Sequence, residues 1–206
     1  MRIILPALTA GLILSLAACA TTPAPGPVSV TRFVDPAVAA RTVGETFFVE
    51  SAPGSAMPPE QLSAYKAAVA AELTERGFVE TSREGASMIA QVRAESTVAA
   101  PATRKRGPVS VGVGGSTGSY GSGVGLGLGI NLGGGGSKET RGTELGVMLR
   151  DARTGATFWE GRAQFSVSVD SPLAISQANA TAIADAMFRE YPGNNGETTE
   201  VRASSQ

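Results

Sequence analysis

Apolar and polar residues alternate along this chain with two different periods. Five stretches alternate at every second position, which is typical of strands that bury one face and expose the other. These stretches cover residues 28–33, 46–50, 88–98, 143–150 and 157–169. Two further stretches repeat their apolar residues every three or four positions, which is the spacing of an amphipathic helix. They run from about Glu60 to Arg76 and from about Pro172 to Glu190.

Local signals at the ends of these stretches support the same elements. Pro58 and Pro59 precede the first helical stretch, and proline is well tolerated at a helix start. Gly77 supplies a left-handed stop, after which Phe78 is placed to pack back over the last turn. The polar turn 151–155 joins two strands and predicts a hairpin. Because each strand has one solvated face, the pattern predicts an α+β fold: an antiparallel sheet of about five strands, packed on one face by two helices.

The first 18 residues have the layout of a secretory signal peptide. Arg2 supplies a positive charge, and an apolar run from Ile3 to Leu16 follows it. A transmembrane helix needs roughly 20 apolar residues, whereas this run is shorter and contains Pro6. Residues 1–18 are therefore predicted to be removed from the mature chain.

Cys19 is the only cysteine of the chain and closes the tetrapeptide Leu16-Ala17-Ala18-Cys19. This tetrapeptide resembles the bacterial lipobox. The resemblance implies cleavage between Ala18 and Cys19 and attachment of acyl chains to the cysteine, which anchors a protein firmly in a membrane. Ala20 follows the cysteine where an Asp would favour the inner membrane, so the resemblance implies a lipid anchor in the outer membrane with the domain facing the periplasm. Anchoring in the inner membrane or at a Gram-positive surface stays an alternative.

The remaining chain is expected to form one domain. Residues 19–27 are rich in Thr, Pro and Ala and are predicted to be a tether between the membrane and the domain. Residues 28–192 contain all the predicted strands and helices and form the α+β domain. The polar residues 193–206 are predicted to be a disordered tail.

Composition limits the chemistry that the chain can carry. There are 17 Lys and Arg and 18 Asp and Glu, so no basic face for nucleic acid is expected. The absence of histidine removes the commonest general base and the commonest zinc ligand. We therefore expect a protein that is not an enzyme and that holds no metal and no cofactor.

A glycine-rich segment, 107–136, interrupts the domain between the third and fourth strands and holds 14 of the 26 glycines. It is not a phosphate-binding loop, because no helical pattern follows it. In its middle, residues 123–132 alternate glycine with apolar residues, which predicts either a flexible β-hairpin insertion or a membrane-active or oligomerising strand. Just before it, Arg104, Lys105 and Arg106 form either a solvated cluster or a weak site for anionic headgroups or cell-wall polymers.

Several short motifs are spread along the mature chain. The order in which they follow one another resembles that of the bacterial lipoproteins of domain-of-unknown-function family 4136. The resemblance implies a compact α+β lipoprotein domain and brings no catalytic residues with it. The motifs are the lipobox Cys19, Val28-Ser29-Val30 with Asp35-Pro36, Thr46-Phe47, Arg76-Gly77-Phe78, Gly85-Ala86-Ser87, the turn 151–155, Phe158-Trp159-Glu160-Gly161 and Tyr191-Pro192.

Individual residues outside the anchor give weak site signals. Trp159 is either a packing residue or a platform for a ligand. Asp151 and Asp170 lie in predicted turns or strand ends, with no partner carboxylate at a defined separation. Ser63 and Lys66 have a Ser-x-x-Lys spacing, but they lie in an ordinary helix.

Three functions follow from these observations. The leading hypothesis is a non-enzymatic lipoprotein of the cell envelope that binds a protein or an envelope polymer. The alternative is a carrier of lipid or another small ligand, held between the helices and the sheet. An envelope hydrolase is the least favoured of the three, because no motif supplies its catalytic groups.

Overall fold

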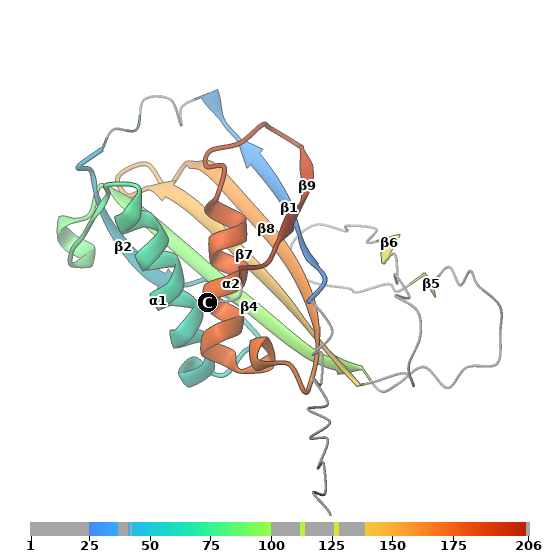
Figure 1. Cartoon of the computed structure of the whole chain (residues 1–206). Coiled ribbons are helices and arrows are strands. Elements are labelled where there is room, and N and C mark those ends of the chain that lie inside the picture. The colour runs from blue at the N-terminus through green and yellow to red at the C-terminus, as the bar shows by residue number, and fades with distance from the viewer. Residues whose placement is uncertain are drawn as a thin grey trace, which may run out of the picture.

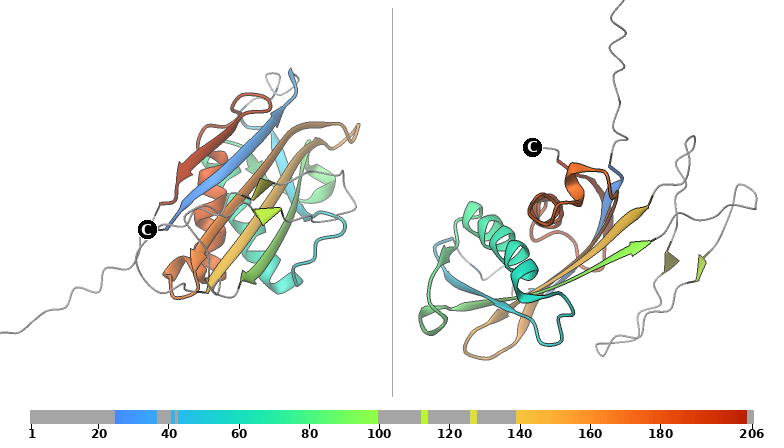
Figure 2. Two further views of the ribbon diagram at one scale, coloured as in Figure 1. Left: turned by 90° about the vertical axis from the view of Figure 1, so that its right-hand side faces the viewer. Right: turned by 90° about the horizontal axis from the view of Figure 1, so that it is seen from below.

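The computed structural model describes residues 25–36, 41, 43–99 and 139–204, together with the backbone of 112–113 and 126–127. One twisted sheet carries two helices on the same face (Figure 1), and Figure 2 shows both helices on that side when the domain is seen from below. The strands of this sheet are β1 (Pro27–Val34), β2 (Thr46–Ser51), β3 (Val79–Glu80), β4 (Met88–Ala99), β7 (Thr140–Asp151), β8 (Thr157–Ser168) and β9 (Thr198–Arg202). The helices are α1 (Pro59–Glu75) and α2 (Ser176–Phe188), with the short 3-10 turns η2 (Arg83–Gly85) and η3 (Pro172–Ala174).

The sheet is larger than predicted and is mixed rather than antiparallel. Its seven strands lie in the order β3-β2-β4-β7-β8-β1-β9. β2 runs parallel to both β3 and β4, while the other pairs are antiparallel. The prediction of about five antiparallel strands was wrong because α1 follows β2 as a crossover, and a crossover helix returns the chain in the parallel direction.

The polar C-terminal segment contributes the seventh strand, so the prediction of a disordered tail over 193–206 was wrong for β9. This strand pairs with β1 in a five-residue register from Pro27 opposite Arg202 to Thr31 opposite Thr198. Val201 is the one apolar residue of β9 and is buried. A single buried residue gives too weak a periodic signal, and the backbone pairing with β1 forms the strand. Pro27, assigned to the tether, is the first residue of β1.

The end of α1 follows the predicted geometry. Gly77 has a φ of +86°, the left-handed conformation that glycine adopts readily. The Phe78 N–H donates to the Leu73 carbonyl at 3.2 Å and the Gly77 N–H to the Thr74 carbonyl at 2.9 Å. These two bonds form the Schellman motif that closes many helices.

The second predicted helix is divided into two elements. Ile175 is extended (φ −71°, ψ 131°) and separates η3 from α2. The Ser171 side chain accepts a hydrogen bond from the Leu173 N–H and thereby starts the 3-10 turn before α2 begins. No helix among the described residues is long and apolar enough to cross a membrane.

The glycine-rich segment is described only in part. Gly112–Val113 (β5) pairs antiparallel with Leu126–Gly127 (β6), separately from the main sheet. The other residues of the predicted insertion 107–136 lie outside the described residues.

The hydrophobic core fills the layer between the two helices and one face of the sheet. It takes alternate residues from each strand and the inward stripe of each helix. Its largest completely buried apolar side chains come from four strands and both helices: Trp159, Phe47, Phe165, Phe188, Leu73, Met88, Leu145, Leu149, Ile183 and Met187.

Two arginines hold the C-terminal end of α2, where the last carbonyls of a helix lack intrahelical partners. Arg32 of β1 is only 1% exposed, and its Nε donates to the Met187 carbonyl at 3.1 Å and its second terminal nitrogen to the Ala186 carbonyl at 3.4 Å. Arg76, just after α1, donates through Nε to the Phe188 carbonyl at 3.1 Å. We call this arrangement the α2 clamp. It combines hydrogen bonds with the attraction of positive charge to the negative end of the helix dipole.

Replacing the buried member of the α2 clamp should destabilise the domain. Arg32→Met retains bulk but leaves the buried Ala186 and Met187 carbonyls without a donor. Each buried group left unsatisfied costs about 1–3 kcal/mol, so we expect the free energy of unfolding to fall by about 2–4 kcal/mol. Urea unfolding followed by tryptophan fluorescence measures the change. The matched change Arg162→Met, at an exposed ion pair of β8, should shift stability by no more than about 0.5 kcal/mol. Equal effects at the two positions would contradict the proposed role of Arg32.

Candidate functional site

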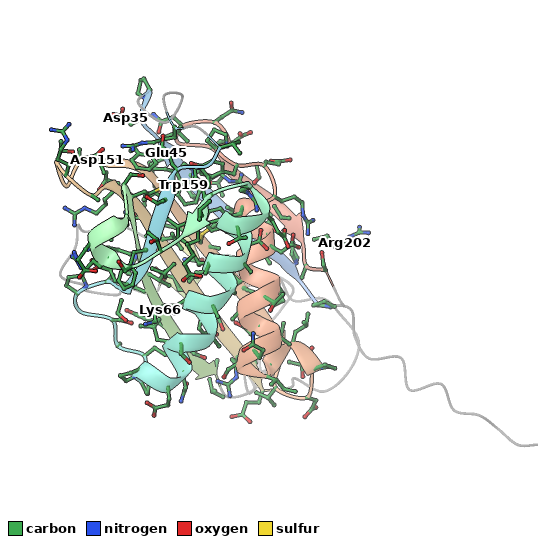
Figure 3. All side chains as sticks on the ribbon, turned by 90° about the vertical axis from the view of Figure 1, so that its left-hand side faces the viewer. Asp35, Glu45, Lys66, Asp151, Trp159 and Arg202 are labelled. Atoms are coloured by element: carbon green, nitrogen blue, oxygen red, sulfur yellow. The ribbon has the colours of Figure 1, made fainter. Side chains whose placement is uncertain are left out.

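The motifs that are scattered along the sequence meet at one end of the domain. Figure 3 shows Asp35, Glu45, Asp151 and Trp159 gathered there, although they come from four different segments. Backbone hydrogen bonds join these segments directly: the Asp35 N–H donates to the Phe158 carbonyl at 2.9 Å. We call this region the motif end. Its other cross-links are the Ala152 N–H to the Ser87 carbonyl and the Ser87 N–H to the Thr46 hydroxyl, at 2.9 and 3.0 Å.

Trp159 is a packing residue at the motif end. It is completely buried and stacks on Phe188 at a centroid distance of 5.1 Å, with Tyr191 at 5.4 Å. Its indole N–H donates to the Pro192 carbonyl at 2.9 Å, which satisfies its only polar group. A Cβ at Gly161 would collide with the indole ring, so the glycine of this motif makes room for the tryptophan. Of the two predicted roles, the structure places Trp159 in the first, because a ligand cannot reach a buried ring.

Arg41 and Asp151 form the main ion pair of the motif end. The Arg41 guanidinium lies 2.9 Å from one Asp151 carboxylate oxygen, 3.2 Å from a Glu45 carboxylate oxygen and 4.3 Å from the centre of the Phe158 ring. The other Asp151 oxygen accepts hydrogen bonds from the backbone N–H and the hydroxyl of Thr154, at 2.8 and 2.9 Å. The Arg41 and Thr154 donors hold the pKa of Asp151 well below its ordinary value.

These groups hold the fold rather than supply a catalytic pair. Because its pKa is low, the Asp151 carboxylate stays ionised at neutral pH and is a poor general acid or base. Burial raises the pKa of Tyr191 to about 12, so its hydroxyl stays protonated. The Ser63 hydroxyl donates to the Glu60 carbonyl at 2.6 Å, in the ordinary manner of a helical serine and not as half of a Ser-Lys pair. Within the described part of the chain, no three His, Cys, Asp or Glu side chains are grouped to hold a metal ion.

Most of the remaining predicted site residues are not tested by the structure. Ala18, Cys19, Arg104, Lys105 and Arg106 all lie outside the described residues. Asp170 lies just after β8, at the opposite end of that strand from Asp151.

The face of the sheet opposite the helices is the second candidate region, and we call it the open face. No described helix covers it, as Figure 2 shows from the side and from below. Toward β2, a row of hydrogen bonds crosses three strands: the Gln91 amide donates to the Glu50 carboxylate at 2.8 Å, and the Arg150 guanidinium donates to the Gln91 amide oxygen at 3.2 Å. Arg83 joins the end of this row through an ion pair of 3.1 Å with Glu50.

A second row crosses the middle of the open face at Gly146, which lies between Arg93 and Arg162 in the strand register. A Cβ at Gly146 would lie 2.6 Å from Arg93 Nε, so the glycine lets the arginine lie across the strand. Arg93 pairs with Glu144 at 3.3 Å and Arg162 with Glu160 at 2.6 Å.

Phe33 lies beside this second row. The Arg162 guanidinium lies 5.2 Å from the centre of its ring, and the Phe33 side chain is 40% exposed. It is the large exposed apolar residue of β1 that faces away from the helices. Sequence analysis did not identify Phe33 or Arg162 as site residues. The one available signal was that each occupies an outward-facing position of its strand. Their contact depends on the register between β1 and β8, which the sequence pattern does not give.

The family of the chain follows from a comparison with known sequences. A family model described as a domain of unknown function, DUF4136, matches residues 39–193. The chain belongs to the DUF4136 family. The match begins after Asp35 and covers β2, β3, β4, β7, β8 and both helices, which confirms the family resemblance. No curated protein matches this DUF4136 chain.

Solved structures give only distant similarities to this DUF4136 domain. A PelC dodecamer from Paraburkholderia phytofirmans has 14% identity and a TM-score of 0.44, with 76% of this chain and 91% of that chain covered. A PDZ domain protein from Parabacteroides distasonis has 10% identity and a TM-score of 0.43, covering 85% and 39%. A homologue of a neuraminyllactose-binding hemagglutinin from Helicobacter pylori has 6% identity and a TM-score of 0.40, covering 73% and 83%. These values carry no argument about function.

The Arg41–Asp151 pair should make stability depend on pH. Because the pKa of Asp151 is lower in the folded chain than in the unfolded chain, its contribution is complete above the ordinary value of 3.8 and is lost as the pH falls below it. Asp151→Asn should therefore be less stable than the parent at pH 7, and the difference should shrink on acidification to about pH 3. Urea unfolding at both pH values measures the difference in free energy of unfolding between the variant and the parent. Glu75→Gln, at an exposed position of α1, serves as the control. If the difference for Asp151→Asn were the same at both pH values, the lowered pKa of Asp151 would be contradicted.

Proposed function

We propose that this protein is a non-enzymatic lipoprotein of the cell envelope, anchored through Cys19, that binds a protein partner with the open face of its sheet. The observation that carries the proposal is the Phe33–Arg162 contact on that face. Arginine and aromatic residues are enriched among the residues that contribute most to protein interfaces. Here one of each lies exposed, in contact, on a surface that no described helix covers.

The charges of the open face fit a protein better than a polyanion. Both rows contain arginines paired with glutamates, so the face carries charges of both signs. A surface for nucleic acid or an anionic polymer requires a concentration of basic residues. A mixed pattern instead favours a partner with its own pattern of both signs, because complementary charges select the partner and fix its register.

The open face is also held in shape before binding. The Glu50–Gln91–Arg150 row fixes three long side chains by hydrogen bonds, and Arg93 lies in the space that Gly146 leaves. A preformed surface loses less side-chain entropy when a partner docks, which favours affinity.

The alternative of a small-ligand carrier has less support. The layer between helices and sheet, where a carrier would hold its ligand, is filled by buried side chains such as Trp159, Phe165 and Met187. A groove of about 620 Å³ lies outside this layer, between α1 and the β2–β3 edge, and Val49 and Ala70 are among its lining residues. The hydrolase alternative finds no catalytic pair in the described residues.

The proposal predicts loss of a partner when the open face is changed. Crosslinking in intact envelopes, followed by affinity purification, would compare the parent chain with Phe33→Ala and Arg162→Glu. Changing one of the few residues that dominate an interface costs more than about 1 kcal/mol, so we expect recovery of the partner to fall roughly five-fold or more in each variant.

Two controls make the result specific. Arg153→Glu makes the same charge change in the exposed turn between β7 and β8 and should leave recovery unchanged. Cys19→Ala tests the anchor separately and should release the protein from the membrane fraction. Full recovery of the partner by both open-face variants would overturn this binding site, and capture of a polymer instead of a protein would overturn the proposed class of partner.

A further inference from the structure

An exposed apolar corner lies at the start of α2. Ile175, between η3 and α2, has 65% of its surface exposed, whereas the neighbouring Leu173 is buried. The two residues border a groove of about 330 Å³ along α2. Its apolar lining continues through Ala178 and Ala182, and Asp185 and Ser204 close one end. We call Ile175 together with this groove the α2 corner.

The α2 corner lies at the end of the domain where the N-terminal segment enters. Pro27, the first residue of β1, is opposite Arg202 of β9, and Ser204 follows two residues later. The Ser204 hydroxyl donates to the Asp185 carboxylate at 2.9 Å and so places the chain after β9 at the groove. Figures 1 and 2 show the start of β1 and η3 at this same end.

The proposed anchor is joined to this end by a short length of chain. Six residue steps separate Cys19 from Pro25, the first described residue of the domain. Even a fully extended chain of that length spans only about 20–22 Å. A bilayer that holds the acyl chains of Cys19 therefore lies within that distance of Pro25, two residues before the start of β1.

We propose that the α2 corner rests on the lipid bilayer, with Ile175 inserted at the boundary between headgroups and acyl chains. The inference rests on the proposed anchor at Cys19. It adds an orientation to that anchor: the domain would be fixed on the membrane by its η3–α2 end rather than swinging freely on the tether.

Apolar contact, and not charge, supplies this interaction. The residues that line the groove include no lysine or arginine, and the Asp185 carboxylate at its end is paired with Arg189. The α2 corner therefore presents no basic patch to anionic headgroups. One isoleucine is too small to bind a membrane by itself. The proposed anchor makes a weak contact sufficient. It keeps the α2 corner close to the bilayer, which gives the corner a high effective concentration at the membrane surface.

The test is fluorescence quenching by lipid, with the full chain produced in cells, extracted and reconstituted into vesicles of zwitterionic phospholipid. The variant Ile175→Trp places an indole at the exposed corner, where a larger side chain has room. On vesicles, we expect the emission of the added indole to shift to the blue relative to an indole in water. In vesicles whose lipid chains are brominated near the headgroup, we expect this emission to be quenched.

Val79→Trp is the matched control, because Val79 is 50% exposed on β3, near the opposite edge of the sheet. Its emission should be unaffected by the brominated lipid, and the buried Trp159 of the parent chain gives the background.

Two further measurements separate the possible failures. Mass spectrometry of the purified chain shows whether Cys19 carries acyl groups, and flotation shows whether the protein is on the vesicles. An acylated, floating protein whose Ile175→Trp emission is not quenched would overturn the docking of the α2 corner and leave the anchor intact. A chain without acyl groups would overturn the proposed anchor and this inference with it. Quenching that is retained at high salt is the supporting result, since apolar contact is not screened.

Discussion

The fold depends on how the C-terminal end of α2 is held. This helix has 13 residues, no side-chain hydrogen bond at its N-terminal cap and no basic residue in its last turn. Short isolated helices are marginal in water, so tertiary contacts must position it. Arg32 and Arg76 do so from two distant parts of the chain, and both direct their guanidinium groups at the final carbonyls of α2. Phe188 then stacks on Trp159, which links the same point to β8.

This arrangement gives the most recognisable motifs a structural role. Arg76, Trp159 and the Tyr191-Pro192 pair each contact the end of α2 or the loop that follows it. Through these contacts they join segments that are far apart in sequence. The charged groups at the same end have their partners within the fold, and Asp151 is surrounded by donors. The surface proposed for a partner is the other side of the sheet, where polar groups form rows rather than a closed network around one residue.

Features that depend on neighbouring residues were predicted well from the sequence. Features that depend on contacts between distant parts of the chain were not. The end of α1 at Gly77 and the hairpin turn at Asp151 depend on neighbouring residues only, and both formed as the sequence indicates. The parallel pairing of β2 with β4 depends on the path of the crossover, which periodicity does not report. β9 has only Val201 to mark its buried face. The contact of Phe33 with Arg162 depends on how β1 and β8 pair, so the sequence alone could not predict that these two residues lie together on the open face.

Strand β1 connects the three regions that matter for the proposed function. Its start lies at the end of the tether, beside the α2 corner. Its alternate residues then divide between the two faces of the sheet: Val30 and Arg32 point to the helices, while Phe33 lies on the open face. Because Arg32 is held in the α2 clamp, the strand cannot shift by one residue without moving a buried charge into solvent and an exposed ring into the core. The same constraint that positions α2 therefore keeps Phe33 on the open face, six residues along β1 from Pro27.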